Sequence, residues 1–305
     1  MSVVQYIQHD AIDPIKWDHC IDQSPQGLIY AYTWYLNIMS PRWNALVLGD
    51  YDAVMPLTTR CKWGIHYLYQ PAFCAELGVF FKDEMQSDIV RLFLDNIPPQ
   101  YKYIDICLNR NNSTAITNDF LIPRNNFILS LSAEYADLQK NYTDNHSRNI
   151  KKAVNHHLTF HADIHYEAAF QLIIASLKNI PSYSLKEWKQ FEHLYQVAAS
   201  KKSATCVGVT DAQSNLLSTV IFFHSHNTWF YLAAGTTNEG KKMGSAHFLV
   251  DSFIRLHAGS NTYLDFEGSD VPSVAFFYKG FGAENRPYAK MHINRLPVWV
   301  RWIKK

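Results

Sequence analysis

Apolar and polar residues alternate in short runs through the first third of the chain. Residues 45–60, "ALVLGDYDAVMPLTTR", predict two strands joined by the polar turn Gly49–Asp52. The elements expected after this hairpin are a strand at 65–70, a helix at 88–97 and a strand at 101–109. This part of the sequence therefore predicts a sheet with a helix packed on it.

The same order of elements returns in the last third of the chain. Residues 203–225 predict a second hairpin, and the elements expected after it are a strand at 228–235, a connection at 236–245, a helix at 246–258 and a strand at 261–268. A β-β-β-loop-α-β unit that occurs twice implies a mixed, mostly antiparallel sheet flanked by helices in each half. The predicted class is α/β (α+β).

Helical periodicity fills the segment between the two halves. Helices are expected at 132–142, 144–157, 166–180 and 184–200. The last of them opens with Ser184 and Glu187, which have the spacing of a capping box. Because these helices would cover the sheet of the second half, we expect a domain boundary near residue 130, between domains 1–130 and 131–305.

Composition excludes several classes of protein. A net charge of +1 over 305 residues argues against bulk attraction to nucleic acid, and DNA is not expected as a partner. Five scattered cysteines and an N-terminus without signal-peptide layout favour a cytoplasmic protein, and no apolar run approaches the ~20 residues of a membrane span. Histidines at 156, 157, 161 and 165 lack metal-site spacing, so no metal is expected. The oligomeric state stays open.

The connection "TTNEGKKMGS" before the helix at 246–258 has the chemistry of an anion site. A helix N-terminus leaves backbone N–H groups unpaired and carries the positive end of the helix dipole. Glycine allows close backbone approach, and two lysines add positive charge. The residues expected to hold a phosphate group are Lys241, Lys242, Met243, Gly244, Ser245 and Ala246. By itself this pattern also fits an ordinary basic turn.

The element order and two motifs resemble the GNAT acyltransferases. That family carries [QR]-x-x-G-x-[GA] at the turn into its central helix, and the aligned residues here are Lys241, Gly244 and Ala246, with lysine in place of Gln or Arg. "SVAFFYKGFGAENRPY" is similar to a later GNAT segment, in which Tyr278 takes the place of the tyrosine that protonates the leaving thiolate. The resemblance implies acyl-CoA, such as acetyl-CoA, as co-substrate.

The duplication is similar to the FemABX group, which includes peptidoglycan-bridge aminoacyl ligases and many uncharacterised bacterial proteins. Tandem GNAT modules and the helical sequence "NHSRNIKKA" carry this resemblance over roughly residues 25–295. In the first half, the segment "CAELGVFFKDEMQ" takes the place of the connection "TTNEGKKMGS", and it contains only Gly78 and no pair of basic residues. We therefore expect the first half to form one side of an acceptor site between the halves. The aromatic stretch expected to line that site is Tyr67, Tyr69, Gln70 and Phe73.

Acyl transfer to an amine needs a base, an oxyanion donor and a proton source for the thiolate. On "NTYLDFEG", period two places Tyr263, Asp265 and Glu267 on one strand face, and Glu267 is the preferred base, with Asp265 second. Oxyanion donors are expected at Ala234 and Gly235. The alternative is that both carboxylates pair with cations and that Tyr278 is a core residue.

The sequence is consistent with three functions, each typical of a different class of protein. The first is an acyl-CoA-dependent N-acyltransferase acting on a small-molecule or peptidoglycan-type amine. The second is a Fem-type ligase that takes an aminoacyl group from tRNA, for which Arg148, Lys151, Lys152 and Asn155 would form a basic helix face, although most such faces are merely solvated. The third is a non-catalytic binding module on a degenerate scaffold.

Overall fold

The chain folds into two compact units of mixed α and β structure. In the computed structural model, which describes residues 3–82, 87–114, 120–177, 183–297, unit 1 comprises residues 1–124 and 287–305 and unit 2 comprises residues 125–286. Unit 2 is thus one continuous stretch inserted into unit 1. Within the described residues, no helix has the length and apolar character that crossing a membrane requires.

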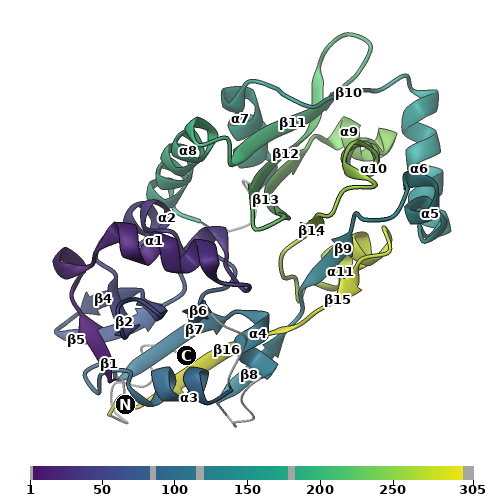
Figure 1. The fold of residues 1–305 in the computed structure, drawn as a ribbon. Coiled ribbons are helices and arrows are strands. Elements are labelled where there is room, and N and C mark those ends of the chain that lie inside the picture. Colours follow the sequence, from purple (N-terminus) through teal and green to yellow (C-terminus); the bar gives the residue numbers. More distant parts are fainter. Residues whose placement is uncertain (1–2, 83–86, 115–119, 178–182, 298–305) are drawn as a thin grey trace. The chain divides into compact units, whose positions relative to one another are not determined.

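Unit 2 is built on one sheet with the strand order β10-β11-β12-β13-β14-β9-β15. Its strands are β9 (Phe127–Ser130), β10 (Thr159–His161), β11 (Ala204–Thr210), β12 (Leu216–Ser225), β13 (Thr228–Thr236), β14 (Tyr263–Asp265) and β15 (Glu284–Asn285). Its helices are α5 (Tyr135–Lys140), α6 (Asp144–Asn155), α7 (Tyr166–Leu177), α8 (Leu185–Ser200), α9 (Asn238–Met243), α10 (Ser245–His257) and α11 (Pro272–Lys279). The helices α7 and α8 lie on one face of the sheet and α10 and α6 on the other (Figure 1).

The core of unit 2 lies between α10 and the sheet. Phe222 of β12 and Phe253 of α10 are fully buried and stack with ring centroids 3.8 Å apart. On the opposite face of the sheet, α8 begins at the expected capping box, because the Ser184 hydroxyl accepts from the Glu187 amide and the Glu187 carboxylate accepts from the Ser184 amide. The helices expected at 184–200 and 246–258 are confirmed, and residues 178–180 of the helix expected at 166–180 lie outside the described residues.

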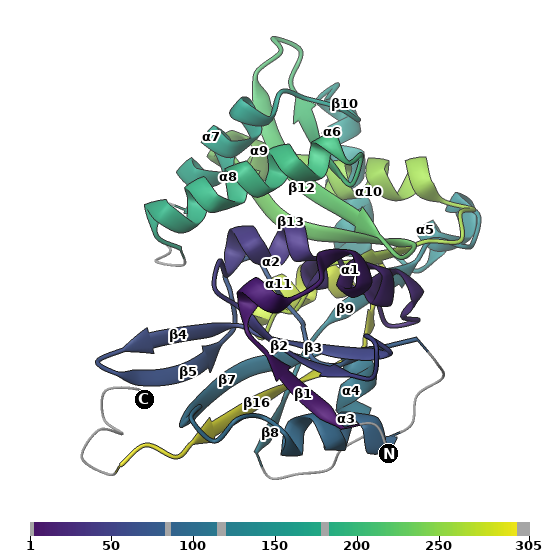
Figure 2. The ribbon, with the colours of Figure 1, turned by 60° about the vertical axis from the view of Figure 1, so that its left-hand side comes forward.

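Unit 1 contains two smaller sheets with the strand orders β1-β2-β3-β6 and β4-β5-β7-β16-β8. Its strands are β1 (Val4–Ile7), β2 (Asn44–Leu48), β3 (Ala53–Leu57), β4 (Thr59–Lys62), β5 (Ile65–Tyr69), β6 (Phe80–Phe81), β7 (Tyr103–Leu108), β8 (Leu121–Arg124) and β16 (Tyr288–Asn294). Its helices are α1 (Pro14–Gln23), α2 (Thr33–Met39), α3 (Ser87–Asp95) and α4 (Arg110–Thr114), with 3-10 turns at His9–Ala11 and Ile29–Ala31. Figure 2 shows the hairpin of β4 and β5 extending from this unit.

The two units share the arrangement that the repeated pattern predicts. In each, the repeated order of elements starts with an antiparallel hairpin, β2 with β3 and β11 with β12. In each, the strand before the connection pairs in parallel with the strand after the helix, β5 with β7 and β13 with β14. In unit 1, a break at Thr58 divides the second strand into β3 and β4, which join different sheets, whereas β12 is continuous.

The unit boundaries differ from the expected division at residue 130 in two places. A boundary there would cut off β9, whose residues Phe127–Ser130 pair with β14 and β15 of unit 2. The last strand, β16, belongs to unit 1, because it pairs with β7 on one side and β8 on the other. Its buried Met291 joins the unit 1 core, a long-range pairing that local patterns do not reveal.

Candidate functional site

The strands β13 and β14 run side by side for only three residue pairs. Thr228 to Phe230 pair in parallel with Tyr263 to Asp265, and β13 then continues alone on this side to Thr236. One extra residue of β13, Leu232, forms a bulge against β12, since Tyr231 pairs with Phe222 and Ala233 with Ile221. Bulges and diverging strands leave backbone groups available next to active sites. This divergence point is the candidate site.

Tyr278 of α11 lies among aromatic rings at this point. Its ring stacks on Phe266 with centroids 4.8 Å apart and meets the edge of Tyr231 at 5.9 Å. Burial, with a smaller effect of Glu267 and Asp265, raises the pKa of the Tyr278 phenol. No hydrogen-bond partner for its hydroxyl is found among the described residues. Tyr278 therefore stays protonated at neutral pH with a proton to donate.

The two candidate bases have different surroundings. Asp265 is 2% exposed, and its carboxylate accepts hydrogen bonds from the Glu267 amide at 2.8 Å and from Asn126 Nδ2 at 3.3 Å. β14 ends at Asp265, and Glu267 has a left-handed φ of 62° and lies partly exposed beyond it. The strand alternation expected through Glu267 is therefore wrong. Asp265 holds the turn, and Glu267 is the carboxylate that solvent reaches.

The connection before α10 is itself partly helical. The structure forms α9 over Asn238–Met243, where only a loop is expected, because Thr237 caps it by accepting from the Gly240 amide at 2.9 Å. Gly244 follows in a left-handed conformation with φ 77°, and a Cβ there would lie 2.4 Å from the Asn149 carbonyl oxygen of α6. Glycine is thus required at 244 for packing, independently of any ligand.

The first turn of α10 presents unpaired amides. Among the described residues, no backbone acceptor is found for the N–H groups of Ser245, Ala246 and His247. The Ser245 side chain is buried and shares a hydrogen bond with the Ser218 hydroxyl, whereas Ala246 is partly exposed. Helix N-terminal amides favour negative charge, so these residues fit an anionic group such as a phosphate.

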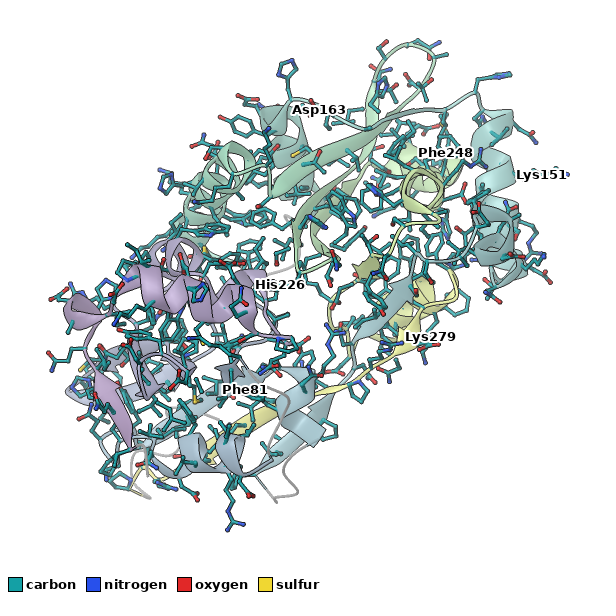
Figure 3. The ribbon with its side chains drawn as sticks, in the orientation of Figure 1. Phe81, Lys151, Asp163, His226, Phe248 and Lys279 are labelled. Atoms are coloured by element: carbon teal, nitrogen blue, oxygen red, sulfur yellow. The ribbon has the colours of Figure 1, made fainter. Side chains whose placement is uncertain are left out.

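Exposed cations lie on the neighbouring helices α6 and α9. Lys241 and Lys242 are exposed on α9, and Lys242 pairs with Glu239 at 3.4 Å. The expected helix face of α6 is exposed as well, and its residues are Arg148, Lys151, Lys152 and Asn155. Figure 3 shows the Lys151 side chain pointing away from the unit. Met243 packs instead against the unit 2 core.

The two residues expected to supply oxyanion donors lie on β13. A Cβ at Gly235 would lie 2.8 Å from the backbone nitrogen of Ile173, so this glycine lets α7 approach the sheet. Ala234 packs against the unit 2 core. Leu232, at the bulge, is the backbone position that the sequence does not reveal, because a bulge depends on the partner strand.

The residues expected to line an acceptor site lie in unit 1. Gln70 is held in the fold, because it donates to the Cys74 carbonyl at 2.7 Å and accepts from the Cys107 amide at 2.8 Å. Phe73 is 5% exposed. Tyr67 and Tyr69 are partly exposed on β5, and the Arg60 guanidinium lies 3.8 Å from the centre of the Tyr69 ring.

A pair of histidines near Tyr278 is missed by the sequence patterns. His146 of α6 and His247 of α10 have ring centroids 4.7 Å apart, and His247 meets Phe277 of α11 at 5.0 Å. Burial and the neighbouring imidazole lower the pKa of His247 to about 4. The first turn of α10 therefore contacts the helix that carries Tyr278. Among the described residues, no group of three or more side chains suited to a metal ion is found.

Solved structures share this arrangement. FemX superposes with a TM-score of 0.69 at 12% identity, over 99% of this chain and 100% of that chain. The chain has the FemX fold. The C-terminal domain of a putative lysylphosphatidylglycerol synthetase from Agrobacterium fabrum gives 0.58 at 7% identity (95% of this chain, 93% of that one), and L-PGS from Bacillus licheniformis gives 0.57 at 10% (95% of each). No family model matches the sequence, and no curated protein matches it significantly.

The comparison confirms the fold that the motifs predict. A FemABX-like relative with GNAT-type units is what the repeated elements and the segment around Tyr278 indicate, and the FemX match spans both units. At identities this low, a shared fold does not carry a shared substrate. The reaction must be argued from the candidate site.

Proposed function

We propose that the protein is an N-acyltransferase that moves an acyl group from acyl-CoA to an amine. The observation that carries this proposal is the position of Tyr278, whose ring packs against Phe266 and Tyr231 where β13 and β14 diverge, beside the strand end that is followed by Asp265 and Glu267. Acyl transfer from a thioester requires a proton donor and a proton acceptor near one reacting centre. Tyr278 is the proposed donor, and Glu267 is the proposed acceptor.

Each residue has a defined task in this reaction. Bound acyl-CoA would supply the activated thioester, with its phosphates at the amides of Ser245, Ala246 and His247. Glu267 accepts a proton from the attacking amine as the nitrogen–carbon bond forms. Tyr278 donates its proton to the sulfur as the carbon–sulfur bond breaks. Glu267 then releases its proton to solvent, and Tyr278 regains one from solvent.

Ligand binding tests the cofactor site directly. Thermal stability of the full chain is expected to rise with CoA or acetyl-CoA, by mass action. The matched variants are Ala246→Glu, which places a carboxylate at the free amides, and Ala246→Gln, which has similar size without the charge. We expect Ala246→Glu to fold normally, since an acidic residue suits the first turn of a helix, and to lose the shift. Ala246→Gln is expected to retain more of it.

Two results would reject the assignment. The absence of any stabilisation at millimolar CoA would exclude the acyl-CoA donor, and equal CoA binding by Ala246→Glu and the unchanged protein would exclude the α10 site. Gly244 variants do not serve here, because they disturb the contact with Asn149 whether or not CoA binds. In turnover, Tyr278→Phe is expected to lower kcat roughly 10²-fold or more while donor binding is unchanged.

A second candidate is transfer of an aminoacyl group from tRNA, as in Fem-type ligases. The exposed cations of α6 and α9 favour it, because contacts between such cations and phosphates attract a polyanion. Salt-dependent binding of tRNA that is lost in a Lys151→Glu, Lys152→Glu variant, with no binding of CoA, would support this donor over acyl-CoA.

A further inference from the structure

The helix that carries Tyr278 is held by packing against the unit 2 core and by hydrogen bonds at its end. None of the described side chains of α11 is fully buried, and Phe276 is 57% exposed. Ala275, Phe277 and Tyr278 pack against the unit 2 core, and hydrogen bonds hold the end of the helix. Its last carbonyl groups face the beginning of α6, where the Thr143 amide donates to the Gly280 carbonyl at 3.0 Å. This junction lies next to the backbone of Tyr278.

His146 makes the second bond of the junction. Its Nε2 lies 2.8 Å from the Phe277 carbonyl oxygen, and its Nδ1 lies 2.8 Å from the Thr143 hydroxyl. Because a carbonyl only accepts, Nε2 carries the proton, and Nδ1 accepts from the hydroxyl. A helix C-terminus leaves such carbonyls without partners, and histidine is suited to satisfy them.

The imidazole is enclosed on every side that the structure describes. His146 is 0% exposed, and its ring contacts the edge of Phe281 at 4.5 Å. A Cβ on Gly280 would lie 1.8 Å from His146 Cε1, so the glycine makes room for the ring at an ordinary φ. Burial lowers the pKa of His146, which keeps the ring neutral. A polar ring buried this completely holds one orientation as long as both hydrogen bonds are made.

We propose that His146 is a positioning residue that fixes Tyr278 in the candidate site through the carbonyl of Phe277. The Phe277 carbonyl belongs to the residue directly before Tyr278, so loss of this bond releases the backbone beside the phenol. Through His247, which touches both His146 and Phe277, the same contact connects the first turn of α10 to α11. The effect of this positioning on catalysis rests on the proposed function, whereas the positioning of Tyr278 by His146 does not.

Two amide substitutions separate hydrogen bonding from packing. The side-chain nitrogen of glutamine reaches approximately the position of histidine Nε2, and that of asparagine approximately the position of Nδ1. His146→Gln therefore keeps a donor for the Phe277 carbonyl, and His146→Asn removes it. A third variant, Thr143→Val, removes only the hydroxyl and retains the backbone bond to Gly280.

Fluorine NMR of the full chain with 3-fluorotyrosine provides a readout that needs no activity. The resonance of Tyr278 is assigned by its absence in Tyr278→Phe. We expect it to shift or broaden in His146→Asn, to return toward its original position in His146→Gln, and to move less in Thr143→Val. An unchanged resonance in His146→Asn, or equal changes in the Asn and Gln variants, overturns the proposal. If His146→Asn does not fold, an unchanged resonance in Thr143→Val overturns it.

Kinetics provide the second readout once a donor and an acceptor are in hand. His146→Asn is expected to lower kcat about 10- to 100-fold with little change in the KM of the donor, because a displacement near 1 Å costs rates of this order. In a Tyr278→Phe background the same change is expected to have no further effect, and additive losses overturn the proposal. Failure of CoA binding rejects the proposed function but leaves the fluorine result interpretable.

Discussion

Gly244→Ala is expected to destabilise unit 2 strongly, for two reasons that add. The left-handed φ of 77° costs an alanine about 1–2 kcal/mol. The new Cβ would also lie 2.4 Å from the Asn149 carbonyl oxygen, which belongs to a helix backbone and cannot rotate away. Pushing α6 aside costs a further 1–3 kcal/mol or so. The expected loss is therefore about 2–5 kcal/mol in the free energy of unfolding, measured by urea denaturation.

Gly259→Ala is the matched control for this change. Gly259 has a φ of +76°, but the nearest atom to its Cβ position is a Glu134 carboxylate oxygen at 3.5 Å. Gly259→Ala has the same unfavourable left-handed φ but no close contact for the new Cβ. Its free energy of unfolding is therefore expected to fall by only about 1–2 kcal/mol. Equal losses in the two variants would refute the argument that Gly244 is required for the approach of α6.

Three further predictions concern unit 2. Ser184→Ala removes the capping box of α8 and is expected to cost about 1 kcal/mol in urea unfolding, whereas a change below measurement error would contradict the cap's contribution. Phe253→Ala removes the ring stacked on Phe222 and is expected to cost about 3–5 kcal/mol, and a loss typical of a surface substitution would show that this contact lies outside the core. The pKa of His247 is lowered from 6.5 to about 4, so its stabilising effect is complete above 6.5 and is lost as the pH falls toward 4. Urea unfolding above and below this pH range measures the effect. The free energy of unfolding is expected to decrease less on acidification in His247→Gln than in the unchanged protein.

Local signals predicted many elements of both units correctly. The capping box at Ser184, the amphipathic stripe of α10 and the two hairpins are short-range patterns, and the structure contains each of them. The parallel pairing of β13 with β14 fits the mixed sheet that the repeated order of elements predicts. These features depend on residues close in sequence, where propensity and periodicity operate.

Long-range contacts account for what the sequence left out. The role of Gly244 depends on Asn149, which is distant in the chain, and the role of His146 depends on Phe277. The bulge at Leu232 exists only in relation to β12. The turn after β14 moved Glu267 off the strand because Asp265 accepts from its amide, a bond that strand periodicity does not anticipate. Each of these is a feature of the tertiary fold.

The return of β16 to unit 1 has a consequence for the order in which the protein folds during synthesis. β16 lies between β7 and β8, so the five-stranded sheet has a gap in its interior until residues 288–294 leave the ribosome. At about 5–20 residues per second, that strand follows Arg124 by roughly 8–34 s. Unit 2 is one continuous stretch, so its synthesis is complete before β16 is made. Until then, β7 and β8 each have an unpaired edge where β16 will bind. The first half of the nascent chain is therefore the part most prone to aggregation, because its strands are made first and stay unpaired longest.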